Sequence, residues 1–397
     1  MSLNGTPRAN QLHIGIFGKR NSGKSTLINA LTGHNTALVS EVAGTTTDPV
    51  YKTIEIYGIG PCVLIDTAGF DDSGDLGLKR VEKTRTAMEK TEVALIVCSE
   101  EDISQEITWA EEFKSRKTPV IMIINKIDQL QNTDKIRNRI FEALKLEPIK
   151  ISAISKLGTE KIREEIIRSL PEDFDAKSIT GDLVGEGDTV LLVMPQDIQA
   201  PKGRLILPQV QTLRELLDKK CIVLSSTADK YEEALKSFVK PPKLIITDSQ
   251  VFKQVYEKKP AESMLTSFSV LYAGHKGDIH YFTESAKAID QLTEKSRVLI
   301  AEACTHVPLT EDIGREKLPH MLRQKVGAGL TIVNVSGNDF PGELADYDLI
   351  IQCGACMFNR KYVMSRVEAA RQQKVPMTNY GITIAYLTKI LDKITMV

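Results

Sequence analysis

Short apolar runs alternate with amphipathic stretches along the first 170 residues of the chain. Leu12–Phe17, Val63–Ile65 and Val120–Ile124 are apolar runs of strand length, and Ser25–Leu31 has the spacing of a helix that buries one face. Strands that alternate with helices usually pair in parallel and are covered by helices on both faces. The pattern therefore predicts an α/β domain over residues 1–174.

The same alternation starts again near Val190 and once more near Leu265. A polar, acidic stretch, Pro171–Asp188, precedes the second start and is predicted to be a linker. We expect a middle βα domain over residues 175–264, suited to packing or dimerisation, and a third α/β domain over residues 265–397. The strands expected there are Val190–Met194, Ile222–Leu224, Leu244–Ile246, Val298–Ala301 and Leu349–Ile351.

The segment between the first strand and the first helix reads Gly-Lys-Arg-Asn-Ser-Gly-Lys-Ser, from Gly18 to Ser25. It matches the phosphate-binding pattern G-x-x-x-x-G-K-[ST] at every fixed position. Its glycines let the backbone approach a phosphate closely, and the start of the next helix offers N–H groups to the anion. Lys24 would reach the terminal phosphates, and Ser25 would bind Mg²⁺. The residues predicted to bind a nucleoside triphosphate here are Gly18, Asn21, Ser22, Gly23, Lys24, Ser25 and Thr26.

A carboxylate motif stands at the end of a second strand. Asp66-Thr67-Ala68-Gly69 ends the run that starts at Val63. Because this edge of a parallel sheet faces the phosphate loop, Asp66 would help to hold Mg²⁺. The N–H of Gly69 would be available to the last phosphate.

A third motif, Asn125-Lys126-Ile127-Asp128, follows the strand Val120–Ile124. The Asp128 carboxylate would accept two N–H bonds from a guanine edge, and Lys126 would cover the ring. Adenine lacks the 2-amino donor, so an adenine would leave the acid unpaired. After the next short strand, further residues would close over the base. The residues predicted to bind the base are Asn125, Lys126, Asp128, Ser152 and Ala153.

In this order and spacing, the motifs of the first domain resemble the G-domain motifs of translation-factor-like GTPases. The resemblance implies that Ala43–Asp48 is the first switch, with Thr45 or Thr46 as a magnesium ligand. It also implies that the polar residues Asp71–Asp75 belong to the second switch. The catalytic residues that it implies are Lys24, Thr46, Asp66 and Gly69.

Two residues narrow the implied chemistry. Phe70 stands where Ras-like proteins have the glutamine that orients the attacking water. Hydrolysis should therefore be slow, or another group must position the water. Asn21 matches the asparagine that holds K⁺ in potassium-activated GTPases, where the cation would act as an arginine finger does. In the simpler alternative, Asn21 only stabilises the loop.

Composition excludes several classes of protein. The chain has 397 residues, of which 42% are hydrophobic and 26% are charged, and its net charge is −1. This describes a globular protein of two or three domains and argues against nucleic acid as the main partner. No apolar run approaches the ~18–20 residues that span a bilayer, and the N-terminus has no signal-peptide pattern. We therefore expect a cytoplasmic protein whose cysteines are thiols or metal ligands.

Two cysteine-containing segments follow expected strands of the third domain. Cys304-Thr305-His306 comes after the strand Val298–Ala301, and Cys353-Gly354-Ala355-Cys356 comes after Leu349–Ile351. Ligands gather at the carboxyl ends of strands in open α/β sheets. The two segments are therefore expected to form one site.

The residue types leave several kinds of site open. A redox dithiol would use only Cys353 and Cys356. A structural zinc ion would take both of these with Cys304 and His306. An iron–sulfur cluster would take the three cysteines and leave its fourth iron to His306, a carboxylate or an external ligand. The simplest alternative is that the thiols are merely buried. Zinc and iron–sulfur remain about equally compatible with the residues.

The three parts together resemble the FeFe-hydrogenase maturation GTPases of the HydF type over nearly the whole chain. The resemblance implies that Cys304, Cys353 and Cys356 bind a 4Fe–4S cluster, with His306 as a possible fourth ligand. It implies a scaffold that accepts a diiron precursor from radical S-adenosylmethionine maturases and delivers it to the FeFe-hydrogenase apoprotein. The implied cofactors are GTP, Mg²⁺, K⁺ and the 4Fe–4S cluster. A homodimer is expected, with no membrane or nucleic-acid partner.

The chain departs from the family pattern at Gln352, because a histidine often precedes the C-x-x-C pair in that family. The fourth site of the cluster is therefore expected to be exchangeable. The remaining histidines without a match, His275, His280 and His320, are expected to be surface or packing residues. The alternative function is a tRNA- or ribosome-associated, K⁺-stimulated GTPase with a structural zinc domain, since it would share the whole first domain.

Overall fold

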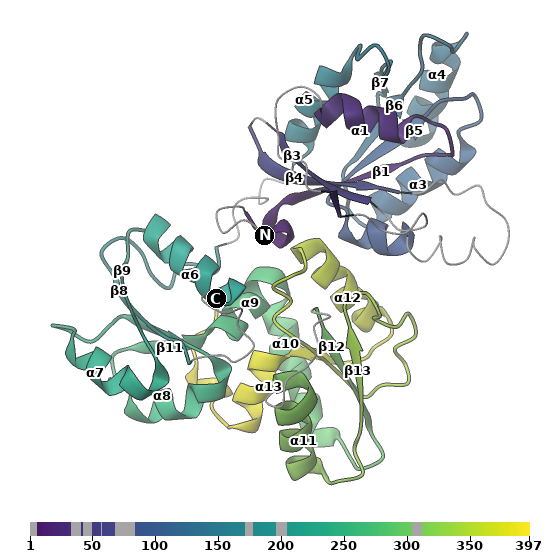
Figure 1. The fold of residues 1–397 in the computed structure, drawn as a ribbon. Helices are drawn as coiled ribbons and strands as arrows, with labels where there is room; N and C mark the ends of the chain where they lie inside the picture. The colour runs from purple at the N-terminus through teal and green to yellow at the C-terminus, as the bar shows by residue number, and fades with distance from the viewer. Residues whose placement is uncertain are drawn as a thin grey trace. The chain divides into compact units, whose positions relative to one another are not determined.

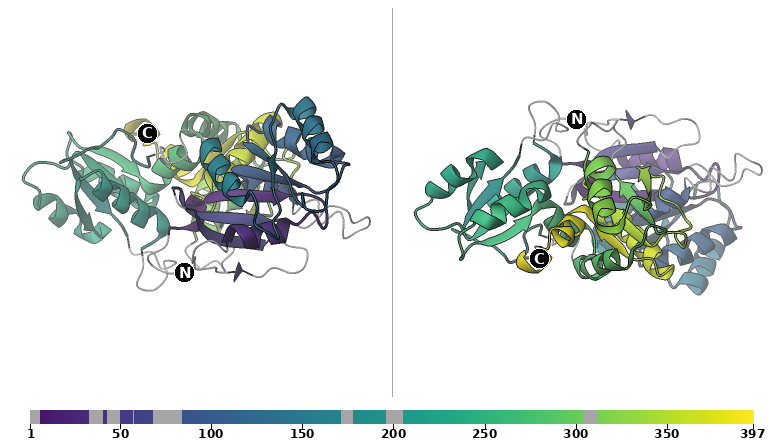
Figure 2. Two further views of the ribbon diagram at one scale, coloured as in Figure 1. Left: turned by 90° about the horizontal axis from the view of Figure 1, so that it is seen from above. Right: turned by 90° about the horizontal axis from the view of Figure 1, so that it is seen from below.

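The computed structural model describes residues 6–32, 41–42, 50–56, 58–67, 84–170, 178–195, 205–303 and 312–397, with backbone alone at 41–42. The chain forms two compact units, residues 1–175 and 176–397, which Figure 1 and Figure 2 show from three directions. Among the helices described, none combines the length and the apolar character needed to cross a membrane.

The first unit is built on one seven-stranded sheet, in the order β2-β3-β4-β1-β5-β6-β7. Its strands are β1 (Leu12–Phe17), β2 (Glu41–Val42), β3 (Val50–Ile56), β4 (Gly60–Asp66), β5 (Val93–Cys98), β6 (Val120–Ile124) and β7 (Ile149–Lys150). The pairs β2–β3 and β3–β4 are antiparallel, and the other neighbouring strands are parallel. The expected parallel core of the domain is confirmed.

Helices cover both faces of this sheet. They are α1 (Lys24–Thr32), α3 (Ser104–Ser115), α4 (Thr133–Leu144) and α5 (Thr159–Ser169). Leu27 of α1 and Ile162 of α5 share one hydrophobic cluster with inward-facing strand residues. Trp109 of α3 and Ile136 of α4 belong to a second cluster on the opposite face. The two apolar faces of each strand explain why these strands read as continuous hydrophobic runs.

The second unit contains two parallel four-stranded sheets, in the orders β11-β10-β8-β9 and β13-β12-β14-β15. The strands of the first are β8 (Thr189–Val193), β9 (Ile222–Ser226), β10 (Leu244–Thr247) and β11 (Met264–Ser267). Those of the second are β12 (Arg297–Glu302), β13 (Thr331–Ser336), β14 (Leu349–Gln352) and β15 (Met377–Asn379). The helices are α6 (Leu207–Asp218), α7 (Tyr231–Lys236), α8 (Phe252–Lys258), α9 (Phe268–Lys276), α10 (Ile279–Ala286), α11 (Leu318–Val326), α12 (Arg360–Gln372) and α13 (Tyr380–Leu387). All five strands expected in this part are present, within a residue or two at their ends.

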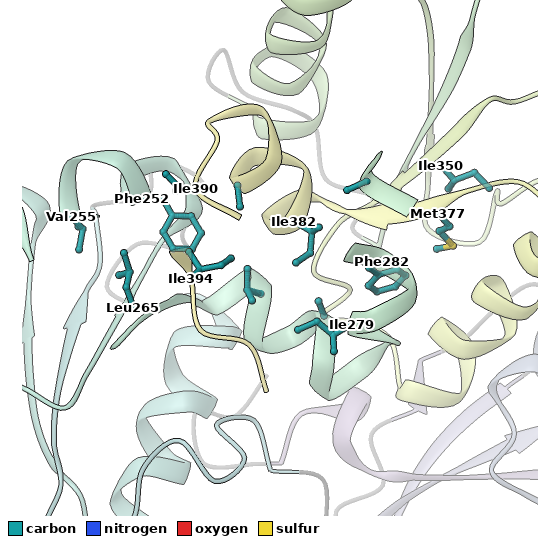
Figure 3. Close-up of a cluster of buried hydrophobic side chains, with 14 of the residues drawn as sticks. Phe252, Val255, Leu265, Ile279, Phe282, Ile350, Met377, Ile382, Ile390 and Ile394 are labelled. Atoms are coloured by element: carbon teal, nitrogen blue, oxygen red, sulfur yellow. The ribbon is translucent and has the colours of Figure 1, made fainter. Parts of the chain in front are cut away.

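One hydrophobic core joins the two sheets of the second unit. Phe252 of α8 and Leu265 of β11 belong to the same cluster as Ile382 of α13 and Met377 of β15 (Figure 3). The β11 strand pairs with β10, so the first sheet continues past the expected domain boundary at residue 264. The middle and third domains are therefore two sheets of one compact unit.

The described part of the expected linker packs against α6. Ile179 and Thr180 are buried. The Glu215 carboxylate accepts hydrogen bonds from the N–H groups of Ile179 at 2.5 Å and Thr180 at 2.8 Å, and from the Ser178 hydroxyl at 2.8 Å. From Ser178 onward the linker interpretation is wrong. Its polar composition gave no sign of the single carboxylate that binds this segment.

Replacing Glu215 with alanine should lower the free energy of unfolding of the second unit by about 2–4 kcal/mol. The substitution leaves several buried donors without their charged acceptor. Urea denaturation followed by circular dichroism measures the change. Asp218→Ala, which removes an exposed acid from the same helix, should have little effect. Equal losses for the two variants would contradict this role of Glu215.

The same carboxylate makes stability depend on pH. Burial favours the neutral acid, but hydrogen bonds from Thr180, Ile179 and Ser178 outweigh it and hold the pKa of Glu215 below its ordinary value of 4.5. A carboxyl with a lowered folded pKa stabilises the protein above its unfolded pKa and loses this effect as the pH falls through the folded pKa. The difference between wild type and Glu215→Ala should therefore be largest near neutral pH and shrink below pH 4.5.

Candidate functional site

The phosphate-binding segment lies between β1 and α1, where the sequence predicts it. Lys24 is buried, and its Nζ donates hydrogen bonds to the carbonyl oxygens of Gly18 at 2.7 Å and Lys19 at 2.8 Å. The lysine therefore points across its own loop. Ser22 is buried as well, and its Oγ has no hydrogen-bond partner among the residues described. A buried hydroxyl without a partner, inside a loop of this pattern, fits a site for an anionic ligand.

The two predicted magnesium ligands in the described part of the chain meet at the carboxyl edge of the sheet. The Ser25 hydroxyl donates a hydrogen bond to Oδ2 of Asp66 at 3.2 Å. Burial raises the pKa of Asp66, while Ser25 and nearby Lys24 and Lys52 act in the opposite direction. A hydroxyl and a partly buried carboxylate in contact are oxygen ligands of the kind that Mg²⁺ takes. This pair therefore fits a magnesium ion.

Asn125 ties the phosphate loop to the predicted base-binding segments. Its side chain is buried; Nδ2 donates to the Ser22 carbonyl at 2.9 Å, and Oδ1 accepts from the Ala153 N–H at 3.0 Å. A single amide thus fixes the relative position of three segments that lie far apart in the sequence. The structure brings together the motifs that the sequence predicts to form one site.

Asp128 lies at the exposed rim of this site, after β6. Hydrogen bonding from Ser152, which is buried, holds the pKa of Asp128 below its ordinary value. Lys126 has a positive φ of 59°, which turns the chain sharply between the asparagine and the acid. The carboxylate is therefore ionised near neutral pH and available as an acceptor for two donors of a base edge.

Position 23 requires a glycine because of its backbone conformation and because of the neighbouring Asn125 side chain. Its φ is +91°, and a Cβ at this position would collide with Nδ2 of Asn125. Gly23→Ala should abolish GTP binding and lower the melting temperature, because the loop and the Asn125 amide cannot both keep their places. Gly187→Ala is the matched control, since Gly187 has a φ of +80° and no atom within 4 Å of the place that a Cβ would take. Isothermal calorimetry with a GTP analogue measures binding; equal affinity in the Gly23 variant and wild type would contradict the assignment.

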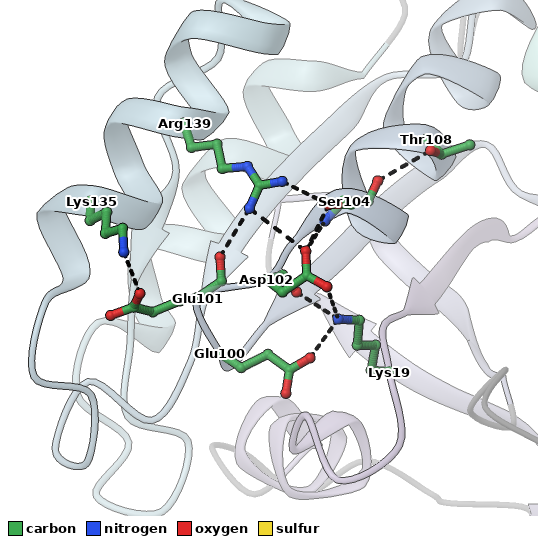
Figure 4. Close-up of polar contacts among 8 residues, drawn as sticks. All are labelled: Lys19, Glu100, Glu101, Asp102, Ser104, Thr108, Lys135 and Arg139. Atoms are coloured by element: carbon green, nitrogen blue, oxygen red, sulfur yellow. Dashed lines mark hydrogen bonds and ion pairs between the residues drawn. The ribbon is translucent and has the colours of Figure 1, made fainter.

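A network of ion pairs and hydrogen bonds connects Lys19 of the phosphate loop to the segment that follows β5 (Figure 4). Lys19 Nζ donates to Glu100 Oε1 at 2.5 Å and to the carbonyl of Asp102 at 2.6 Å. The Asp102 carboxylate in turn accepts from the N–H and the hydroxyl of Ser104, at the start of α3. Lys19 thus binds the loop to the end of β5 and does not point to the phosphate site. The sequence pattern, which leaves this position variable, gives no signal for that role.

Several predicted site residues lie outside the described residues. They are Thr45, Thr46 and the rest of Ala43–Asp48, Gly69, Asp71–Asp75, Cys304 and His306. Their roles stay predictions.

The second candidate site is the loop from Cys353 to Asn359, which connects β14 to α12. Cys353 N donates to the Ala301 carbonyl at 2.9 Å, so the loop leaves the sheet directly beside the end of β12. Cys353 Sγ accepts hydrogen bonds from the N–H groups of Ala303 at 3.1 Å and Ala355 at 3.4 Å. Ala303 immediately precedes Cys304. The residue before Cys304 therefore lies beside Cys353, at the ends of β12 and β14; whether Cys304 and His306 join Cys353 in one site stays a prediction.

Cys356, the second cysteine of this loop, is partly buried. It packs against the apolar cluster that contains Phe268, Leu271 and Tyr272 of α9. The loop is also held by Lys276, whose Nζ donates to the Phe358 carbonyl at 3.0 Å. In the sequence, the burial of Lys276 is indicated only by the apolar residues of α9 that precede it.

The donor set of this loop fits an iron–sulfur group. Backbone N–H groups directed at a sulfur stabilise a thiolate and are typical of cysteines that bind metal. Within the part of the chain described, no group of three or more His, Cys, Asp and Glu side chains is arranged to hold a metal ion. Cys304 and His306 lie outside that part. Other cysteines are structural: Cys62, Cys98 and Cys221 are buried free thiols, and burial raises the pKa of each.

Three family models match successive parts of the chain. The model of a 50S ribosome-binding GTPase matches residues 13–126. The model of the hydrogen maturase F dimerization domain matches residues 179–277, and that of the hydrogen maturase F tetramerization domain matches residues 280–397.

Individual proteins are similar to part of the chain. The GTPase Der of Streptococcus pneumoniae (strain ATCC BAA-255 / R6) is 30% identical over 217 residues, which cover 52% of this chain and 48% of that protein. The chain thus spans about half the length of the curated relatives that it matches. The G domain of the T. maritima FeoB iron transporter is 22% identical, with a TM-score of 0.32, over 40% of this chain and 98% of that one. Aquifex aeolicus Era is 20% identical, with a TM-score of 0.34, over 57% of this chain and 98% of that one.

Proposed function

Because the chain belongs to the hydrogen maturase F family of hydrogenase maturation GTPases, we propose that it is a scaffold that carries a metallocluster to the FeFe-hydrogenase apoprotein. In this proposal the second unit binds a 4Fe–4S cluster and accepts a diiron precursor from radical S-adenosylmethionine maturases. The first unit binds and hydrolyses GTP, and its nucleotide state controls the exchange of partners. A nucleotide can do this only if it interacts differently with two conformations of the protein.

The observation that supports the proposal is the contact of Cys353, at the end of β14, with Ala303, the residue that follows β12 and precedes Cys304. The Ala303 N–H lies 3.1 Å from Cys353 Sγ, although the two residues are 50 positions apart. We propose that Cys353 and Cys356 bind the cluster together with Cys304, and that the fourth iron stays exchangeable. The buried Gln352 precedes the pair where a histidine ligand would otherwise stand. An exchangeable iron is what docking of a second cluster requires.

In the first unit, we assign each step of nucleotide binding to residues of the site. Asp128 selects guanine by accepting two donors, and Asn125 holds the base-binding segments against the phosphate loop. Ser25 and Asp66 would hold Mg²⁺, which supplies positive charge to the phosphates when it is bound. The carbonyls of Gly18 and Lys19 hold the Lys24 ammonium group in the loop. Because an ammonium group has three N–H donors, Lys24 can keep both of these hydrogen bonds and also donate to a terminal phosphate.

We also propose that hydrolysis is slow and stimulated by K⁺ at Asn21. Asn21 is exposed in the phosphate loop and has a positive φ of 60°, so its side chain is accessible to a cation beside the phosphates. The GTPase rate should be at least about tenfold higher in KCl than in NaCl of equal ionic strength, because one well-placed charge contributes that much or more. Asn21→Ala should remove the difference and leave the rate in NaCl nearly unchanged. Equal rates of the wild type in both salts would contradict the potassium site.

We propose that the chain assembles at least as a homodimer through the sheet β11-β10-β8-β9. The β9 strand lies at the edge of this sheet and exposes Ile222, with 62% of its surface accessible. Val210 and Leu217 of the neighbouring α6 are also exposed. Apolar residues on and beside an open sheet edge are typical of a surface that pairs with another chain. Light scattering measures the assembly, and a monomer at micromolar concentration would contradict it.

The scaffold function is tested by transfer between purified proteins. Protein isolated from cells that contain the radical S-adenosylmethionine maturases should activate purified apo-hydrogenase, measured as hydrogen evolution. Protein isolated from cells without these maturases should not. Equal activation by both preparations, or by neither, would contradict a carrier role.

A further inference from the structure

Two buried cations lie at the cysteine loop. Lys276, at the end of α9, is 3% exposed, and its Nζ donates to the carbonyl of Phe358 at 3.0 Å. Tyr272, one turn earlier on α9, lies in the cluster against which Cys356 packs. One face of α9 therefore contacts the loop at both Cys356 and Phe358 and places an ammonium group there.

The second cation is Arg366 of α12, which is 2% exposed. Its guanidinium lies over the rings of Phe340, Phe358 and Tyr362, at 4.7, 4.6 and 4.6 Å from their centroids. Nη2 donates to the Gly337 carbonyl at 2.6 Å. Nη2 also donates to the Tyr362 hydroxyl oxygen at 3.3 Å, whereas Nε and Nη1 have no hydrogen-bond partner among the residues described.

Phe358 connects the two cations to the loop. Its carbonyl accepts from Lys276 and its ring faces Arg366, and it lies two residues after Cys356. Phe358 and Tyr362 also belong to the small cluster that Cys353 packs against. The arginine therefore packs directly against Phe358 of the cysteine loop.

Two acids near the end of β12 already have partners of their own. Glu302, at the end of β12, is 3.2 Å from Nε of Arg315. The Asp312 carboxylate accepts from the N–H groups of Gly314 and Arg315 at 2.8 and 2.9 Å. Burying a cation is costly unless a negative charge or a full set of acceptors compensates for it. Arg366 has incomplete acceptors, and aromatic faces compensate only in part.

We propose that Lys276 and Arg366 balance the negative charge of an iron–sulfur cluster bound at Cys353 and Cys356. This inference rests on the proposed scaffold function. A 4Fe–4S cluster held by three thiolates is an anion, and reduction adds one more negative charge. Nearby charge is one of the terms that set the reduction potential of such clusters. The two cations therefore favour the reduced cluster through their charge and do not ligate iron.

The test is a potentiometric titration of the anaerobically reconstituted full-length protein, followed by electron paramagnetic resonance. At the wild-type midpoint, equal amounts of cluster are oxidised and reduced. At that potential, Lys276→Met and Arg366→Met should each lower the ratio of reduced to oxidised cluster about tenfold, which is a midpoint shift of about 59 mV for one electron. Lys276→Arg and Arg366→Lys keep the charge and should stay close to the wild-type ratio. Lys253→Met, which removes a 73% exposed lysine on α8, is the control for surface charge.

The outcomes separate this inference from the function on which it rests. A wild-type protein that binds no iron and sulfide overturns both proposals. A wild-type protein with a cluster, whose methionine variants shift no more than Lys253→Met, overturns the charge-balancing role alone. If Lys276 and Arg366 only stabilised the fold, all four variants would bind less cluster and the midpoint potential would not change. This result would also overturn the charge-balancing role. If one methionine variant fails to fold, the other position, on a different helix, gives the same test.

Discussion

Asp128→Asn should weaken GTP binding by about two to three orders of magnitude and create affinity for xanthosine triphosphate. In the proposed site the carboxylate accepts two donors of guanine, whereas the amide would offer a donor of its own where guanine also has a donor. Losing hydrogen bonds to a charged group while leaving donors unpaired has an effect of this size. Xanthine has a carbonyl oxygen in place of the 2-amino group, so it can accept from the new amide. The site should therefore change its base preference without losing its phosphate site.

Competition with a fluorescent nucleotide measures both affinities. Asp134→Asn is the matched control, since Asp134 is 77% exposed on α4 and pairs with Lys150. The control should bind GTP as the wild type does. If the Asp128 variant lost both nucleotides equally, or lost neither, the assignment of this carboxylate to the base would be wrong.

Cys353→Ser should abolish cluster binding and hydrogenase activation while leaving GTP hydrolysis within about twofold of the wild-type rate. Serine preserves the size of the side chain, but its hydroxyl is a poor ligand for iron compared with a thiolate. Cys353 lies in the second compact unit, whereas every described residue of the nucleotide site lies in the first. Iron analysis, hydrogen evolution after transfer and phosphate release measure the three quantities on one preparation.

Cys221→Ser is the matched control for this experiment. Cys221 is a buried thiol of the same unit that is not a predicted cluster ligand, and its Sγ donates to the Gly185 carbonyl. It should keep its cluster and its ability to activate the hydrogenase. If a folded Cys353→Ser protein lost GTP hydrolysis to the same extent as hydrogenase activation, the assignment of these two functions to separate units would be wrong.

The nucleotide site could be predicted closely from the sequence because each of its parts is local. Gly23, Lys24 and Asp128 belong to short segments, each fixed by the strand before it, and parallel strands bring those segments to one edge. The contact of the Asn125 amide with both Ser22 and Ala153 follows from that arrangement. The same reasoning placed Cys353 beside the segment that leads to Cys304.

Features that depend on packing between distant segments could not be predicted. The short strand β15 has too few residues to show a period, and it is defined by its pairing with β14. The common core of the two sheets in the second unit depends on apolar residues of α9, α10 and α13. In the sequence, these residues are equally compatible with two separate cores, one for each sheet. Arg366 has no sequence signal at all, because an arginine on an amphipathic helix is normally solvated. Its aromatic surroundings come from Phe340, Phe358 and Tyr362, which only the fold brings together.

Anaerobic analysis of iron, sulfide and zinc in the purified protein, with electron paramagnetic resonance of the reduced sample, tests the central claim most directly. The scaffold proposal predicts about four irons and four sulfides per chain and the signal of a reduced 4Fe–4S cluster. It also predicts that Cys353→Ser loses both. A colourless protein that retains one zinc ion per chain and takes up no iron on reconstitution would contradict the proposal. That result would favour a GTPase with a structural zinc site.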